Sequence, residues 1–329
     1  MKAIVFDHFG AEDVLRFDEV AAPELRPGDL LVRVAAAGVN RADLQQRAGA
    51  YGVQAFGDSE LLGLELAGTV IAAGSGATGF APGDRVMGIV GGGAYAEQAR
   101  IDHGMAVRIP ADMSFIDAAA VMESFVTAYE AVAHLAGIRS GQSVLVHAAA
   151  GGIGSACVQL AAALGATVFA TASKAMAAEV GRLGAAHVYD YRDDDFVVGI
   201  MARTAEAGID AVIDFVGGDY LARNLRVLKP GGCLVQVGIL SGQAETAIPL
   251  KLVLQRHLKI VGTVMKSRSP AEKRAMTERF AAHVLPLFAT GQLKPIISAV
   301  YPLAEAADAH RRMKAGGGFG KIVLDVAPE

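Results

Sequence analysis

A largely apolar strand that runs directly into a glycine-rich turn constrains the fold of this chain more than any other feature. Residues 143–149 have the composition of a buried strand in a parallel sheet. Gly151, Gly152 and Gly154 follow at once, and residues 155–164 have helical composition without a breaker. Small residues let a backbone approach a pyrophosphate, and a helix N-terminus supplies amide donors. The segment therefore predicts a dinucleotide-binding turn, with contacts from Ala150, Gly151, Gly152, Ile153 and Gly154.

A tight turn that binds no ligand remains an alternative, because Ala149 stands where the first glycine of the motif would be. The wider pattern favours the nucleotide interpretation, since strand-like and helical stretches alternate through the middle of the chain. Strands are expected at 143–149, 167–172, 187–191, 211–216, 233–237 and 258–264, with helices at 155–164, 174–183 and 219–228. Six such strands predict a doubly wound, parallel Rossmann sheet.

The N-terminal part of the chain predicts a different, mostly β domain, because short strands alternate there with glycine- and proline-rich turns. Helices are expected at 115–136, crossing between domains, and near 271–289. The tail is expected to return to the first domain. The predicted division is a β-rich catalytic domain of residues 1–122 and 291–329, and a dinucleotide-binding domain of residues 123–290. The β-rich domain's strands are expected at 2–6, 30–35, 66–72, 85–89 and 94–100.

Composition narrows the class of protein. The chain has 329 residues, of which 53% are hydrophobic, and its net charge is −4. The negative charge argues against a general affinity for nucleic acid. Cys157 and Cys233 are the only cysteines, so free buried thiols are expected in place of a disulfide framework. There is no signal-peptide pattern and no apolar stretch long enough to cross a bilayer, and we expect a soluble, cytoplasmic protein without a membrane partner.

Six short motifs, in their order and spacing, carry a family resemblance. They are Gly38–Asp43, Gly63–Gly68, Pro82–Val86, Ala149–Gly154, Tyr189–Arg192 and Gly320–Leu324. The chain resembles the medium-chain dehydrogenase/reductase superfamily, and within it the zinc-free, zeta-crystallin-like quinone oxidoreductases. The resemblance covers nearly the whole chain. It implies an α/β fold with an N-terminal GroES-like β domain, followed by the Rossmann domain.

The resemblance also allows the metal question to be argued from residues. Zinc alcohol dehydrogenases of the superfamily use a cysteine and a histidine where this chain has Asn40 and Leu64. Neither an amide nor an isobutyl group is a credible zinc ligand, and a structural zinc lobe would need four clustered cysteines. We therefore expect no metal, and a substrate that accepts hydride without a Lewis acid.

The cofactor is expected to be NADPH. NAD-preferring sites usually place an acidic residue at the end of the second nucleotide-domain strand, and this chain has none there. Thr171, Ser173 and Lys174 offer hydroxyls and a positive charge that suit a 2′-phosphate. In the family that it resembles, the lysine and a tyrosine matching Tyr191 bind that phosphate. A solvated helix-opening lysine and a tyrosine packed at a strand end remain the alternatives.

Two further glycine turns are expected at C-terminal strand ends, where doubly wound folds bind ligands. Gly217 follows the strand at 211–216. Gly238 follows the next strand, and the resemblance places the nicotinamide against that second turn. Turn geometry alone would also explain both glycines. Cofactor contacts are assigned here to Gly217, Gly238, Ile239, Leu240 and Ser241, and by resemblance to Phe319 and Lys321 near the C-terminus.

The candidates for the reaction pocket are Asn40, Tyr51 and Thr127. The resemblance places Asn40 and Thr127 beside the nicotinamide, where they would also contact the cofactor. Tyr51 would offer a flat ring and a phenol to a planar substrate. Alternatively, Asn40 is a turn residue that caps a helix beginning near Arg41. Asp43 is expected to brace this segment or to be a first-turn acid, and Glu65 to be buried and structural.

These residues predict an NADPH:quinone oxidoreductase that works by positioning a hydride donor against a flat acceptor in a dry cleft between domains. Two alternatives stay open, an enoyl or alkenal reductase and a non-catalytic NADPH-binding protein, because fold alone does not decide between them. The physiological acceptor and the choice between hydride and single-electron transfer are also open. A homodimer is expected through the apolar strand at 258–264, which would lie at a sheet edge.

Overall fold

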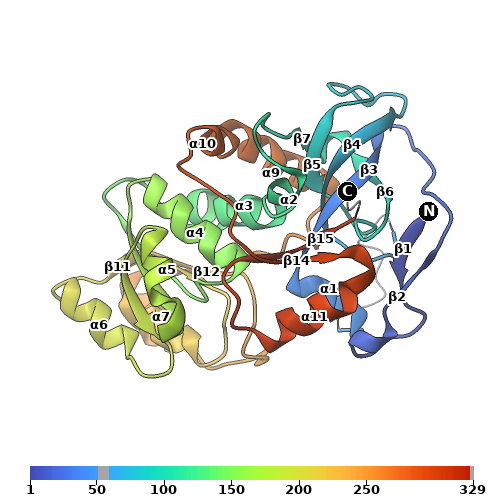
Figure 1. Cartoon of the computed structure of the whole chain (residues 1–329). Coiled ribbons are helices and arrows are strands. Elements are labelled where there is room, and N and C mark those ends of the chain that lie inside the picture. The colour runs from blue at the N-terminus through green and yellow to red at the C-terminus, as the bar shows by residue number, and fades with distance from the viewer. Residues whose placement is uncertain (51–58, 327–329) are drawn as a thin grey trace. The chain divides into compact units, whose positions relative to one another are not determined.

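The polypeptide divides into two units, one of which is assembled from three separate stretches of sequence. The structure, a computed structural model, describes residues 1–50 and 59–326. The first unit comprises Met1–Val126, Lys266–Ala289 and Lys294–Glu329, and the second comprises Thr127–Met265 and Thr290–Leu293. The colours of Figure 1 show that N-terminal (blue) and C-terminal (red) segments share the first unit.

The second unit is built on a six-stranded sheet with the order β10-β9-β8-β11-β12-β13, paired in parallel throughout. In chain order this is 3-2-1-4-5-6, the order of the Rossmann fold. The prediction of a doubly wound parallel sheet is confirmed. The strand order reverses between β8 and β11, so the turns after these two strands lie at the switch point where such folds bind ligands. The strands are β8 (Ser143–Val146), β9 (Thr167–Ala172), β10 (Ala185–Asp190), β11 (Ile209–Asp214), β12 (Leu228–Gln236) and β13 (Lys259–Gly262).

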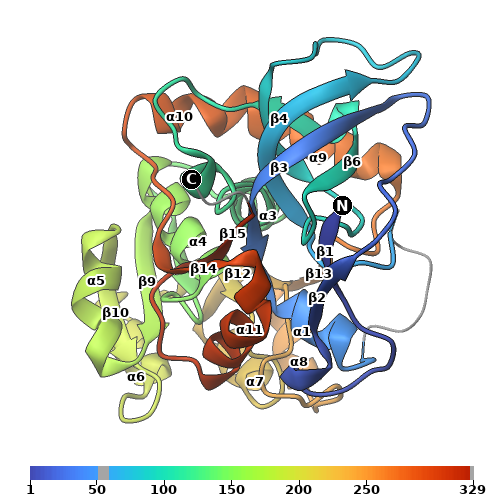
Figure 2. The ribbon, with the colours of Figure 1, turned by 45° about the vertical axis from the view of Figure 1, so that its right-hand side comes forward.

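Helices join these strands and bury one side against the sheet. Figure 2 shows α5 beside β9 and β10. Strand residues such as Leu145 and Val212 share a buried apolar cluster with the helix residues Ile200 and Leu225. The elements are the π-helix η3 (Glu130–Leu135), α4 (Gly152–Ala163), the 3-10 helix η4 (Lys174–Met176), α5 (Ala177–Arg182), α6 (Phe196–Arg203), α7 (Tyr220–Val227) and α8 (Leu250–Arg256).

The first unit contains a seven-stranded sheet with the order β14-β15-β3-β4-β5-β7, and β6 also pairs with β3. The last strand, β15, pairs antiparallel with β3, which confirms that the tail returns to the first domain. A separate pair, β1 with β2, completes the unit's strands among the described residues. The strands are β1 (Lys2–Val5), β2 (Arg16–Glu19), β3 (Asp29–Val39), β4 (Glu65–Ala73), β5 (Arg85–Ile89), β6 (Gln98–Asp102), β7 (Ala106–Arg108), β14 (Ile297–Pro302) and β15 (Lys321–Asp325).

Short helices connect the strands of the first unit. They are η1 (Glu12–Val14), α1 (Arg41–Arg47), η2 (His103–Met105), α2 (Phe115–Ala118), α9 (Pro270–His283), α10 (Leu285–Ala289), η5 (Leu303–Glu305) and α11 (Ala306–Ala315). The expected helix at 115–136 is divided into α2, α3 (Met122–Tyr129) and η3. Within the described part of the chain, no helix combines the length and hydrophobicity needed to cross a membrane.

The segment 266–289 packs with the first unit, whereas the sequence predicted it as part of the dinucleotide-binding domain. Arg274 of α9 forms an ion pair with Asp102 at the end of β6, with 3.0 Å between Nε and Oδ2. Phe280 is fully buried, and the ring of Phe288 lies edge-on to that of Phe125, with 4.8 Å between centroids. These contacts join residues far apart in sequence, so they leave no local signal.

Candidate active site

The glycine turn after β8 is shaped by close approaches that only small residues allow. A Cβ on Gly154 would lie 2.2 Å from the carbonyl oxygen of Ala148, so a larger residue cannot occupy this position without displacing the turn. Ala148 itself has a left-handed φ of 47°, a conformation that L-residues rarely adopt. Gly151 is exposed, and a Cβ there would lie 3.3 Å from the same oxygen. The turn thus presents open backbone in front of the N-terminus of α4.

This turn brings together all five residues predicted to contact a pyrophosphate. Gly151 precedes α4, Gly152 and Ile153 open it, and Gly154 is buried beneath it. Ala150, Gly152 and Ile153 are partly exposed. The first N–H groups of a helix have no partner within the helix, and the helix dipole favours an anion there. The turn therefore fits a pyrophosphate.

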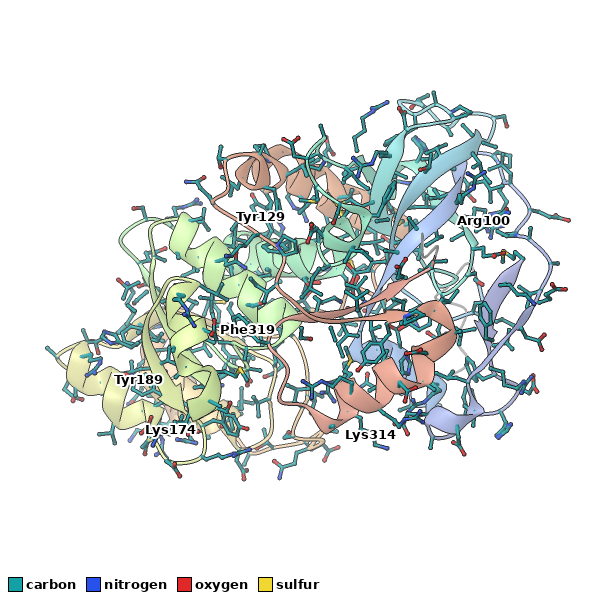
Figure 3. All side chains as sticks on the ribbon, viewed as in Figure 1. Arg100, Tyr129, Lys174, Tyr189, Lys314 and Phe319 are labelled. Carbon is teal, nitrogen blue, oxygen red and sulfur yellow. The ribbon has the colours of Figure 1, made fainter. Side chains whose placement is uncertain are left out.

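The residues predicted to recognise a 2′-phosphate take different positions at the end of β9. Lys174 is exposed, and Figure 3 marks it. Ser173 is partly exposed just before it. Tyr191, which is 45% exposed, lies after β10 with the Arg192 guanidinium 5.4 Å from its ring centroid. Asp190 accepts the backbone N–H groups of Lys174 and Arg192. Cationic and aromatic groups are therefore available to a phosphate at this edge.

Thr171, by contrast, faces the interior of the second unit. Its hydroxyl lies 2.9 Å from Nδ1 of the fully buried His147. The His147 Nε2 lies 2.8 Å from Oδ1 of Asn224, whose amide donates to Asp214. Burial lowers the pKa of His147, which favours a neutral ring. Asp214 also accepts the N–H of Gly217, so this buried chain of polar groups braces the glycine turn after β11. This network has no local sequence signal, because its members come from β9, β11, α7 and the turn after β8.

The second pair of predicted turns lies after β11 and β12. Gly217 has a left-handed φ of 67°. The carbonyl of Gly238 accepts a bond from the Gln236 amide at 2.7 Å. Leu240 and Ser241 donate their N–H groups to the backbone that follows β11, and both side chains are exposed, as is that of Ile239. Exposed apolar side chains over a fixed backbone can pack against a flat ring.

In the first unit, Asn40 is held by a buried charged network. Its Nδ2 donates to Oε1 of Glu65 at 3.0 Å and to the carbonyl of Gly38 at 3.3 Å. The ammonium of Lys321 bonds to Oδ1 of Asn40, to Oε1 of Glu65 and to the carbonyl of Val39, at 2.6, 2.6 and 2.9 Å. All three N–H bonds of Lys321 are thus used within the protein. A direct contact between Lys321 and a cofactor would require one of them to break.

The hydrogen bonds of the Asn40 amide limit the further hydrogen bonds that it can form. Both amide N–H groups of Asn40 already have acceptors, and its amide oxygen accepts from Lys321 and takes part in a capping box with Asp43. Asn40 therefore cannot donate a hydrogen bond to an acceptor oxygen in this arrangement. It also precedes α1, which begins at Arg41, as the helix-capping alternative predicted.

Asp43 braces this segment, as the sequence indicated. Its carboxylate accepts the N–H of Asn40 at 2.8 Å, the N–H of Gly63 at 3.2 Å and the hydroxyl of Tyr95 at 3.1 Å. Burial raises the pKa of Asp43 to about 6, although these hydrogen bonds and Lys321 oppose the shift. Glu65 is fully buried, as expected.

The remaining pocket candidates are less closely tied to this network. Thr127 is buried, and its hydroxyl has no hydrogen-bond partner among the described residues. Tyr51 lies outside the described residues. Phe319 is partly buried and just precedes β15 (Figure 3). Leu64 is buried, and the residues that the structure describes contain no group of three or more His, Cys, Asp or Glu side chains placed to hold a metal ion.

One titratable residue of this region was missed by the sequence analysis. Glu123 lies in the first turn of α3, and its N–H donates to Oε2 of Glu65 at 2.9 Å. Burial, reinforced by the nearby charge of Glu65, raises the pKa of Glu123 to about 8. No local motif marks such a residue, because the charged groups around it come from β4, β15, α1 and α9.

Comparisons with known proteins agree with this architecture. Residues 26–111 match the family described as alcohol dehydrogenase GroES-like domain, and residues 183–324 match the family described as zinc-binding dehydrogenase. Human quinone oxidoreductase is 31% identical over 98% of this chain and 97% of its own length. The spectinabilin polyketide synthase system protein NorB of Streptomyces orinoci is 37% identical over 94% of this chain, which spans only 14% of that protein's length.

Two solved structures are closely similar. Escherichia coli quinone oxidoreductase complexed with NADPH has a TM-score of 0.88 and 29% identity, with 99% of this chain and all of that chain covered. The CurK enoyl reductase has a TM-score of 0.89 and 28% identity, with 99% of each chain covered.

Proposed function

Because the chain belongs to the zinc-free quinone oxidoreductase family of the medium-chain dehydrogenase/reductase superfamily, we propose that it reduces a quinone with hydride from NADPH, without a metal ion. The observations that carry this proposal are the exposed glycine turn before α4 in the second unit and the residues at positions 40 and 64 in the first. Asn40 and Leu64 stand where the zinc alcohol dehydrogenases of the superfamily have a cysteine and a histidine, and neither side chain is a credible zinc ligand.

The second unit would hold the cofactor through three sets of groups. The open backbone of Gly151 and the N-terminus of α4 suit the pyrophosphate. Ser173 and Lys174 after β9, with Tyr191 after β10, suit a 2′-phosphate, which is the reason to propose NADPH over NADH. The turn from Gly238 to Ser241 would support the nicotinamide. NADPH, when bound, supplies a hydride from its C4 carbon.

The first unit would orient the reactants and exclude water. Asn40 has a fixed amide plane because Lys321, Glu65 and the Gly38 carbonyl hold it. The family resemblance places this fixed amide beside the nicotinamide ribose. Preorganised groups of this kind accelerate a reaction by positioning, at little cost in reorganisation. A quinone suits such a site, because aromaticity stabilises its reduced oxyanion and solvent can protonate it.

A second candidate function, reduction of a conjugated enone, is favoured by the similarity to the CurK enoyl reductase. An enone leaves an enolate that needs a proton donor close by. The third alternative is an NADPH-binding protein without turnover.

A screen of NADPH oxidation over matched panels of quinones and conjugated enones tests these proposals. We expect quinones to give the higher kcat/KM. We also expect Asn40→Ala to lower kcat/KM, while Gln45→Ala, on the exposed side of the same helix, leaves it unchanged. Higher kcat/KM values for enones would favour the second function. Tight NADPH binding without oxidation by any acceptor would favour the third.

A further inference from the structure

Glu123 has an unusual position for a carboxyl group. It is only 9% exposed, and its own backbone N–H is bonded to Glu65. The other oxygen of Glu65 accepts from Asn40 and Lys321. Glu65 therefore joins the start of α3 to the residue that we assign to the nicotinamide ribose, and Glu123 belongs to the same buried cluster.

The side chain of Glu123 has an oxygen that takes no part in the hydrogen bonds of that cluster. Its Oε2 is buried and has no hydrogen-bond partner among the described residues. An ionised carboxylate left unpaired in such a place is costly, because it loses hydration without gaining a partner. A neutral carboxylic acid avoids that cost and keeps one O–H to donate.

The charges around Glu123 shift its pKa in opposite directions. Glu65 on β4 and Asp43 on α1 disfavour its ionised form, while Lys321 on β15 and Lys273 on α9 favour it. Lys266, just before α9, also feels the charge of Glu123, and its ammonium lies 2.9 Å from Oε1 of Gln46. Burial has the largest effect, and with it the pKa of Glu123 rises to about 8. The group is therefore mostly protonated at neutral pH, close to the value that suits a general acid.

We propose that Glu123 donates the proton of its carboxyl group to the reduced acceptor, a step that an enolate requires and that solvent can replace for a quinone oxyanion. This inference rests on the proposed function. Neighbouring groups are less suited to the task. Asp43 uses its oxygens to accept three hydrogen bonds, and Asn40 has no N–H to give. Thr127, four residues later on the same helix, has a hydroxyl that is also buried and unpartnered among the described residues.

A conjugated enone would be reduced in two steps, hydride transfer and then proton transfer. Hydride from NADPH forms a C–H bond at the β-carbon and leaves an enolate, so the acceptor gains two electrons and NADPH becomes NADP⁺. The Glu123 O–H bond then breaks, and its proton forms a C–H bond at the α-carbon or an O–H bond that tautomerises. The resulting carboxylate is buried and takes a proton back from water before the next cycle. A quinone oxyanion accepts its proton in the same way, but it can also use solvent.

The first test needs neither cofactor nor acceptor. Infrared spectra of the whole chain at pH 7 should contain the carbonyl band of a protonated carboxylic acid, which titrates away with a midpoint of about 8. Glu123→Gln should lack the band. Ser124→Ala, a buried neighbour on the same helix whose hydroxyl also has no partner among the described residues, should keep it. A band that survives in Glu123→Gln would assign the proton to another residue and overturn the proposal.

The second test uses turnover. With an enone, Glu123→Gln should lower kcat roughly 100-fold, within the range typical of general acids, while a quinone loses less than about threefold and the NADPH Kd is unchanged. Reduction in D₂O should deuterate one face of the α-carbon in the unmodified protein and both faces in Glu123→Gln. Glu123→Asp should recover part of the enone rate.

Three outcomes of this second test would count against the proposal. Equal losses for quinone and enone would make Glu123 structural, and unchanged enone kinetics would remove it from the reaction. If the unmodified protein oxidises NADPH with neither acceptor, the proposed function fails and the proton donor fails with it. That result differs plainly from the first two, in which the unmodified protein is active.

Discussion

At the scale of single residues, a charge at the end of β9 is expected to decide the cofactor. Lys174 is exposed there, with no acidic residue at the end of its own strand. Replacing it in Lys174→Glu removes a charge-assisted contact worth roughly 1.5–3 kcal/mol, or about 10- to 150-fold in affinity. NADPH should therefore lose much more affinity than NADH in a fluorescence titration of both cofactors. Lys251→Glu, an equal charge change on α8, serves as the control, and equal losses for both cofactors in Lys174→Glu would refute the assignment.

The buried carboxyl of Glu123 also predicts how stability depends on pH. Its pKa is about 8 in the folded protein against an ordinary value of 4.5, so the folded state binds more protons than the unfolded state between those values. The free energy of unfolding must then fall as pH rises through this window, by up to about 1.4 kcal/mol per pH unit. Glu123→Gln should remove this contribution, so its stability relative to the unmodified protein should increase from pH 5 to pH 8 in urea unfolding. A constant difference across that range would contradict the prediction.

The sequence predicted some roles at this scale and not others. Asp43 was expected to brace its segment or to be a first-turn acid, and Glu65 was expected to be buried and structural. Glu123 had no local signal, since the charged groups around it come from β4, β15, α1 and α9. Lys321 likewise lies on β15, which pairs with β3 although most of the sequence separates the two strands. Its hydrogen bonds therefore leave no local signal. Protonation state and donor count are properties of the tertiary structure.

At the scale of elements, substitutions at two glycines of the same turn should have different effects, one on stability and the other on cofactor binding. A Cβ at position 154 would lie 2.2 Å from the Ala148 oxygen, and one at position 151 would lie 3.3 Å from it. Gly154→Ala should therefore lower the Tm by several degrees, as overpacking by about 1–3 kcal/mol implies. Gly151→Ala should keep most of the stability but weaken NADPH binding, because its methyl group would cover the open backbone that we propose as the pyrophosphate site. Calorimetry and cofactor titration of both variants check this, and similar Tm losses would contradict it.

The elements themselves were largely predictable where periodicity and turns are local. The strand expected at 85–89 has those bounds, and the helix expected at 155–164 begins three residues earlier, at Gly152. The helix expected at 115–136 was interrupted, and the helix α9 joined the first unit because of Arg274 and Phe280. Those differences arise from contacts between distant segments, which hydrophobic pattern alone does not encode.

At the scale of the whole molecule, the exposed edge of β13 predicts a dimer. This strand ends the sheet, and apolar side chains are exposed on and beside it, including Leu254 of α8 at 75% and Ile260 at 41%. An uncovered edge with an apolar border favours pairing with a second copy. The protein should sediment as a dimer at micromolar concentration, and Leu254→Glu should shift it toward monomer. Val198→Glu, an equally polar change on the exposed face of α6, should not, and a monomeric unmodified protein would refute the interface.

The pairing of β15 with β3 has a consequence for biosynthesis. A ribosome releases the N-terminal strands long before it adds the strand that completes their sheet, because β15 ends at Asp325. The second unit is nearly continuous, from Thr127 to Met265, and domains tend to fold as units during synthesis. The second unit can therefore fold while the N-terminal part of the first unit still lacks β15. A nascent chain halted near residue 300 should already bind to a resin that carries immobilised NADPH. It should do so even though Lys321, the hydrogen-bond partner of Asn40, has not yet been synthesised.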